Sequence, residues 1–187
     1  MFILFAIALA NEKCNNFFCY TRQDEIQEWE LIGFAEGFDF SEYGKDHTSS
    51  LDLTPDFDEL PLTTINCKFP SSNYPITLII PKTVKTIKPN VFSQVQNVKM
   101  ELTFGDDISI GNNAFENCQG LLSLNFEGTV KQIGDFSFKD CIKLTTLSKI
   151  NVEQIGREAF SGCTSLQGKL EISTETKIIG DSAFSNC

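Results

Sequence analysis

The chain has 187 residues, a length typical of one domain or of one domain with a small additional region. Hydrophobic residues make up 41% and charged residues 21% of it, which is ordinary for a globular protein and excludes a wholly disordered chain or a membrane protein with many spans. The formal net charge of −10 argues against a nucleic-acid partner, because binding to the phosphate backbone requires a basic surface.

Residues 1–10 form an uninterrupted apolar run that ends in Ala8-Leu9-Ala10. The run is too short to span a bilayer, and its small-x-small ending is typical of a signal peptidase site. The sequence therefore predicts a signal peptide over residues 1–10, although no basic residue precedes the run. A buried N-terminal strand is the alternative. No later stretch reaches 18 apolar residues, so the sequence predicts no transmembrane span.

Residues 11–69 are expected to form an acidic N-terminal flank or cap. Of the 25 acidic residues, 13 lie between Glu12 and Glu59, where Lys13, Arg22 and Lys45 are the basic residues. Such charge usually faces water, but it could also face a basic partner or cations.

Three cysteines and the one histidine also lie in this flank. Cys14, Cys19 and Cys67 fall outside any repeat, and we expect one pair of them to form a disulfide, without a choice of pair. His47 lies in a polar, turn-like stretch. It is the one histidine available as a catalytic base, and no nucleophile motif accompanies it, so the sequence predicts a non-enzymatic protein without a cofactor or a metal site.

An internal repeat dominates residues 70–187. The pattern Ile-Gly-x-x-Ala-Phe-x-x-Cys recurs in four clear or close copies, and a degenerate first copy lacks the Gly and the Cys. The Phe positions are 23, 23, 22 and 24 residues apart, within the period of leucine-rich repeats. The five positions are Phe92, Phe115, Phe138, Phe160 and Phe184.

Short apolar alternations lie between the copies and predict strands. Leu-x-Ile or Leu-x-Phe occurs at residues 78–80, 102–104, 124–126 and 170–172, with a version stretched by one residue at 147–150. A second apolar pair, such as Val130 and Ile133, predicts another extended segment in each repeat. We expect the Gly after Ile to adopt a positive φ, and Ala-Phe-x-x-Cys to form a short helical turn.

A unit of about 23 residues cannot bury its own apolar face, so neighbouring units must stack and share one core. The sequence therefore predicts an α/β solenoid: a short, curved leucine-rich repeat array of about five coils, the last one incomplete. It is expected to have a parallel strand ladder, short helical turns and a small N-terminal cap region.

The repeat closely resembles the BspA-like leucine-rich repeat family over roughly Tyr74 to Cys187, because the Ala-Phe-x-x-Cys half is far more specific than the leucine pattern. Such repeats occur in surface proteins of anaerobic bacteria and parasitic protists. The resemblance implies a secreted or cell-surface protein that adheres to host cells or matrix proteins, and it implies no catalytic residues. Residues 11–69 match no pattern of the family.

The repeat cysteines share one position and should form a buried column of free thiols, because a row along a solenoid does not converge on a tetrahedral metal site. Their parallel Cβ directions also make disulfides between coils awkward. The column consists of Cys118, Cys141, Cys163 and Cys187, with Val95 at its head.

The outward residues of the predicted strands are the candidate binding residues, because solenoids commonly bind partners on their concave sheet surface. Most are small and polar, which suits a broad protein or glycan interface better than a small-molecule pocket; the alternative is a sheet that merely faces water. These residues are Thr77, Ile79, Glu101, Thr103, Ser123, Asn125, Thr146, Ser148, Lys169 and Glu171.

Two further expectations concern partners. The open last coil could associate with another copy of the chain, since an uncovered coil exposes core and a strand edge. A competing interpretation is an intracellular scaffold for protein–protein interactions that retains residues 1–10 and keeps all seven thiols reduced.

Overall fold

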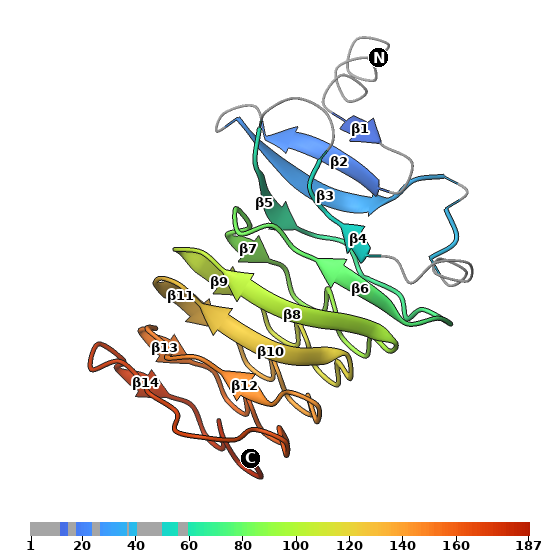
Figure 1. The fold of residues 1–187 in the computed structure, drawn as a ribbon. Coiled ribbons are helices and arrows are strands. Elements are labelled where there is room, and N and C mark those ends of the chain that lie inside the picture. Colours follow the sequence, from blue (N-terminus) through green and yellow to red (C-terminus); the bar gives the residue numbers. More distant parts are fainter. Residues whose placement is uncertain (1–11, 15–17, 24–26, 37, 41–49, 56–59) are drawn as a thin grey trace.

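In the computed structural model the repeats wind into a β-solenoid of about five turns, with the two sides of each coil contributing to two separate sheets (Figure 1). The structure describes residues 12–14, 18–23, 27–36, 38–40, 50–55 and 60–187. The predicted signal peptide, residues 1–10, and His47 therefore lie outside the described residues.

Within the described residues, one sheet has nine strands and the other has five. The nine-stranded sheet contains, in spatial order, β1 (Glu12–Cys14), β2 (Phe18–Gln23), β3 (Glu28–Phe34), β5 (Leu62–Ile65), β7 (Thr86–Ile87), β9 (Ile108–Ile110), β11 (Val130–Ile133), β13 (Gln154–Ile155) and β14 (Ile178–Ile179). The five-stranded sheet contains β12 (Thr146–Leu147), β10 (Leu121–Phe126), β8 (Val98–Phe104), β6 (Ile76–Ile79) and β4 (Ser50–Asp52).

The strands form where apolar and polar residues alternate. In β8 the side chains of Val98, Met100, Leu102 and Phe104 are buried, while those between them are exposed or half-buried. From β3 onward, neighbouring strands in both sheets pair in parallel, as stacked coils of one hand require. The predicted parallel ladder is therefore present. The stretch at 170–172 is shorter than predicted and contributes a single bridge, from Ile172 to Ile150.

The third side of each coil consists of consecutive turns, so the predicted short helical turns are wrong: the described residues contain no helix. Along these turns the backbone N–H groups alternate: one donates to a carbonyl of its own coil, and the following one donates to a carbonyl of the next coil. Ala114 donates to the carbonyl of Gly111, whereas Phe115 donates to the carbonyl of Ser137, one coil further along the stack. In a helix these donors would all bond along its own axis.

Positive φ angles at two fixed repeat positions explain this turn. φ is 57° at Asn113 and 50° at Asn117. A left-handed residue at each of these positions interrupts a right-handed helix before a full turn can form. The other copies have positive φ at the same positions, namely at Asn90, Gln94, Phe136, Asp140, Glu158, Gly162, Ser182 and Asn186.

The glycine that follows Ile in each repeat has a different role from the one predicted, because φ at these glycines is not positive. A Cβ added at Gly156 would lie 2.5 Å from the backbone nitrogen of Asp135, and one at Gly180 would lie 2.5 Å from that of Arg157. Glycine is required there because the backbones of adjacent coils touch. The contact sets the close spacing of the coils on this side.

Stacked phenylalanines fill the core next to the turns. Neighbouring ring centroids are 4.7 to 5.2 Å apart from one end of the stack to the other, and the rings of Phe138 and Phe160 are nearly parallel, at 10°. The stack contains one more ring than the sequence predicted, since Phe69 lies 4.7 Å from Phe92. It consists of Phe69, Phe92, Phe115, Phe138, Phe160 and Phe184.

Part of the acidic N-terminal region covers the first coil. Strand β2 pairs antiparallel with β3, whereas β3 pairs in parallel with β5 and so continues the solenoid sheet. Trp29 of β3 is buried, and the buried Tyr20 donates its hydroxyl to the carbonyl of Leu53 at 3.2 Å, which ties this hairpin to the segment after β4. Figure 1 shows the hairpin at the end of the stack opposite the C-terminus.

One cysteine of this region is bridged. Cys19 is disulfide-bonded, and the register of β1 with β2 places it opposite Cys14. Cys67 is a free, half-buried thiol. The disulfide expected among the three N-terminal cysteines therefore involves Cys19 and excludes Cys67.

Candidate functional site

The candidate binding residues lie on the outward surface of the five-stranded sheet and its continuation at Lys169 to Glu171, here called the outer face. Their neighbours in sequence, such as Leu78, Leu102 and Leu124, point into the core. On the outer face, Thr77, Ile79, Glu101, Thr146, Lys169 and Glu171 are exposed, and Thr103, Ser123, Asn125 and Ser148 are half-buried.

The parallel register aligns these side chains in rows that cross the coils. Asp52 of β4 is opposite Ile79 of β6, Glu101 of β8 is opposite Ser123 of β10, and Ser123 is opposite Thr146 of β12. Ile79 and Glu101 each lie two residues after a paired residue, Thr77 and Lys99 respectively, so the pleat places them side by side. We call this line the central row: Asp52, Ile79, Glu101, Ser123 and Thr146.

Sequence reasoning missed three residues of the outer face. Ser50 and Asp52 are exposed on β4, in a region whose strands were not predicted, and Lys99 is exposed on β8. Lys99 forms an ion pair with Glu101 at 2.8 Å, and Lys169 forms the equivalent pair with Glu171 at 3.2 Å. Extending the alternation of β8 two residues toward its N-terminus would have found Lys99.

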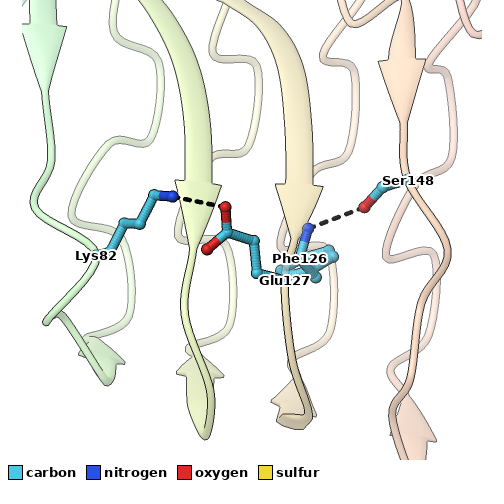
Figure 2. Close-up of polar contacts among 4 residues, drawn as sticks. All are labelled: Lys82, Phe126, Glu127 and Ser148. Carbon is cyan, nitrogen blue, oxygen red and sulfur yellow. Dashed lines mark hydrogen bonds and ion pairs between the residues drawn. The ribbon is translucent and has the colours of Figure 1, made fainter.

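One predicted binding residue is already engaged in the fold. The backbone N–H of Phe126 donates to the Ser148 hydroxyl oxygen at 2.8 Å (Figure 2). β12 ends at Leu147, so the Ser148 side chain supplies the acceptor that a longer strand would have supplied from its backbone. Ser148 therefore stabilises the edge of the sheet and is a weaker candidate for ligand contact.

A second contact spans two coils at the corner beside the outer face. The Lys82 ammonium and the Glu127 carboxylate are 2.5 Å apart, and Figure 2 shows both side chains reaching toward each other across β8. Gly105, which follows β8, carries no side chain that could block them. Both side chains are about half exposed, so the pair contributes at most about 1 kcal/mol to stability.

Comparison with known protein families now adds to this geometry. The family model of the BspA type leucine rich repeat region matches residues 63–187 with six copies. The chain belongs to this family. Neither a curated protein nor a solved structure matches the chain. The family model has one copy more than the five that the sequence analysis predicted. The match begins at Thr63, before the first predicted copy, and in this region Ile65 pairs with Ile87 and Phe69 begins the ring stack.

The cysteine column of the BspA-type repeats is free, as predicted: Cys118, Cys141 and Cys163 are fully buried, while Cys187 is exposed. The Cys141 thiol donates to the carbonyl of Phe115 at 3.0 Å, and the same contact recurs in the next coil. Burial raises the pKa of Cys118 and of Cys163 to about 12 and also raises the pKa of Cys141. These buried thiols are protonated at neutral pH and are poor nucleophiles and metal ligands.

Two searches of the described ranges complete the description of the site. No group of three or more His, Cys, Asp or Glu side chains in them is arranged to hold a metal ion. None of their segments forms a helix with the length and apolar character needed to cross a bilayer.

Proposed function

We propose that this protein is a non-enzymatic binding protein that recognises another protein through the outer face, and that it acts outside the cell in adhesion or host-cell interaction. The observation that carries the proposal is the alignment of exposed side chains from successive coils in rows, such as the central row. Repeat solenoids use such extended surfaces for binding partners, and BspA-type leucine-rich repeats are associated with protein binding.

Two features support a location outside the cell. The apolar run over residues 1–10 has the composition of a signal peptide. Cys19 is disulfide-bonded, and structural disulfides persist in oxidising compartments. The partner would be a protein on a host cell surface or in its matrix, with a surface glycan as the other ligand class.

The binding experiment uses a triple variant with a matched control. Replacing Thr103, Asn125 and Thr146 with Arg adds three long, charged side chains to the outer face. Replacing Thr86, Gln132 and Gln154 with Arg adds the same charge to strands of the nine-stranded sheet.

Labelled wild-type protein and both variants would be tested on cultured cells and on a panel of purified matrix proteins and glycans. We expect the first variant to lose at least about tenfold in affinity, because long charged side chains in the interface displace contacts and must be desolvated, and we expect the control variant to bind normally. Equal binding by wild type and the first variant, with unchanged circular dichroism, would refute the outer face as the binding surface.

The second candidate is an intracellular scaffold, which is favoured by the five free thiols among the described cysteines. N-terminal sequencing of the native protein from culture medium and from shaved cell surfaces separates the two. A mature start near Asn11 supports export, whereas an intact Met1 found within cells alone supports the scaffold.

A further inference from the structure

One residue of the outer face has chemistry unlike that of its neighbours. Ile79 lies within the five-stranded sheet, between β4 and β8, and 42% of its surface is exposed. The residues around it in the two adjacent rows are small or charged, such as Thr77 and Thr103. A large aliphatic side chain with this exposure leaves a substantial apolar surface in water, and that surface is available to a partner.

Acidic side chains lie on both sides of Ile79 in the central row. Asp52 is directly opposite it on β4, and Glu101 is beside it on β8. The Asp52 carboxylate accepts hydrogen bonds from the backbone N–H and the hydroxyl of Thr54, and no cation pairs with it among the described residues. Glu101 is paired with Lys99. The row around Ile79 is therefore apolar at its centre, with a carboxylate that has no cation partner among the described residues on one side and the carboxylate of an exposed ion pair on the other.

The part of the sequence that contains Asp52 also carries a net negative charge. The excess of acidic over basic residues lies entirely before Cys67, and three further acids, Asp56, Asp58 and Glu59, follow Asp52 closely in the sequence. Strand β4, at one end of the outer face, belongs to this acidic part of the sequence. A positively charged partner would be attracted to this end over a longer range than a contact distance.

The end of the outer face opposite β4 has fewer side chains available to a partner. The Ser148 hydroxyl is engaged by the backbone of Phe126, and the Glu171 carboxylate is paired with Lys169, so within the described residues this end has no counterpart of the unpaired Asp52 carboxylate. The central row ends at Thr146, on a strand of two residues. Chemistry suited to a specific contact is concentrated on β4, β6 and β8.

We propose that Ile79 and its acidic neighbours Asp52 and Glu101 form the anchor point for a cationic protein segment. The segment carries an aliphatic or aromatic side chain that covers Ile79, with Lys or Arg residues beside it that pair with Asp52 and displace Lys99 from Glu101. The inference rests on the proposed function, since it names the chemistry of the partner that the outer face receives. Buried apolar contacts supply affinity, and the flanking charges supply orientation.

The first experiment identifies the preferred partner chemistry. An array of immobilised 15-residue peptides would vary the number of Lys or Arg, of Asp or Glu, and of aliphatic or aromatic residues independently. The labelled full chain would be applied at low and at high salt. We expect the bound peptides to combine basic with apolar residues, and binding to fall at high salt because the charges are exposed. Selection of acidic or neutral peptides, or of none, would overturn the proposal.

The second experiment uses matched variants with the best peptide from the array. Ile79→Ser should weaken binding by about tenfold, or about 1.4 kcal/mol, whereas Ile142→Ser should not, although Ile142 is exposed to a similar extent, 39% against 42% for Ile79. Glu101→Gln should weaken binding and its salt dependence, whereas Glu153→Gln, which alters an exposed ion pair with Lys177 away from the outer face, should not.

The two proposals fail differently. If the triple Arg variant loses binding but Ile79→Ser and Glu101→Gln do not, the outer face binds a partner and the anchor point is wrong. If all outer-face variants bind the peptide as wild type does, both proposals are refuted.

Discussion

Truncation of one ring in the phenylalanine stack tests how the coils stabilise one another. Phe138 is fully buried, with Phe115 at 5.2 Å on one side and Phe160 at 5.0 Å on the other. Replacing a buried Phe with Ala typically costs about 3 to 5 kcal/mol, and each stacked aromatic pair adds about 0.5 to 1.5 kcal/mol beyond the buried area. Since Phe138 has two stacked neighbours, we expect Phe138→Ala to cost about 4 to 5 kcal/mol.

The matched control is Phe184→Ala, at the end of the stack. Phe184 is half-buried and has a single ring neighbour, Phe160, at 5.2 Å. We therefore expect a cost of about 2 kcal/mol, below the usual range for a fully buried ring. The difference between the two variants isolates the contribution of a position inside the stack.

Urea unfolding measured with two signals is the assay. Far-ultraviolet circular dichroism reports on the whole solenoid, and the fluorescence of Trp29, the one tryptophan in the chain, reports on the N-terminal hairpin where it is buried. In a repeat protein each unit contacts its neighbours alone, so a weak coil can unfold separately. For Phe138→Ala we expect the dichroism change to precede the Trp29 change. Coincident transitions shifted equally in both variants would refute the reasoning.

Three further predictions concern single contacts. Gly156→Ala should cost about 2 to 3 kcal/mol in a urea titration because its Cβ would overlap the preceding coil, whereas Gly33→Ala, with no atom within 4 Å of the new Cβ, should change stability by less than about 1 kcal/mol. Ser148→Ala should cost about 1 to 2 kcal/mol by leaving a backbone donor unpaired, and an equal loss for Ser123→Ala would contradict this role. Burial raises the pKa of Cys118 from 9 to about 12, so the folded chain keeps a proton that the unfolded chain releases. Stability should be intact below pH 9 and fall toward pH 12, with each thiol shifted in this way, such as Cys118 and Cys163, contributing up to about 1.4 kcal/mol per pH unit; Cys118→Val should remove one such contribution and make the slope shallower.

The sequence was sufficient for the repeating core because its signals are periodic. A Phe every 22 to 24 residues and a short Leu-x-Ile or Leu-x-Phe strand in each repeat predicted the stacked coils and the parallel ladder. The first coil was missed because its copy is degenerate: Ile65 is four residues before Phe69, whereas Ile87 is five before Phe92, and Asn66 and Ser72 occupy the positions of the repeat Gly and Cys. Strand β3 was missed because acidic residues interrupt the short apolar alternation of Trp29 and Leu31, and β4 was missed because its three residues include a single apolar one, Leu51.

The turns were mispredicted because the same residues suit two conformations. In Ala-Phe-x-x-Cys the Cys follows the Ala by four residues and the Phe by three, a spacing compatible with a helical turn, and the local bond from Cys118 to Phe115 has the spacing of a tight helix. The distinguishing signal was the position before Cys, where Asn117, Asp140 and Gly162 tolerate a left-handed backbone. For the candidate site, strand alternation gave the outward residues, but the register that aligns them in rows depends on the coil lengths in three dimensions.

The regular offset between coils has a consequence for how proteins of this kind change over evolutionary time. The turn residues of each coil bond to residues 21 to 24 positions later, as when Asn113 donates to Asp135 and Phe138 donates to Ala159. Because these bonds are made to the adjacent coil alone, unequal recombination that duplicates or removes one whole repeat leaves them in place elsewhere in the stack; a pair that spans two coils, such as Lys82 with Glu127, would be lost if the change fell between its members. Each such event would lengthen or shorten the outer face by one strand, about 4.8 Å. The length of the outer face can therefore evolve in discrete steps, independently of the chemistry of any single row.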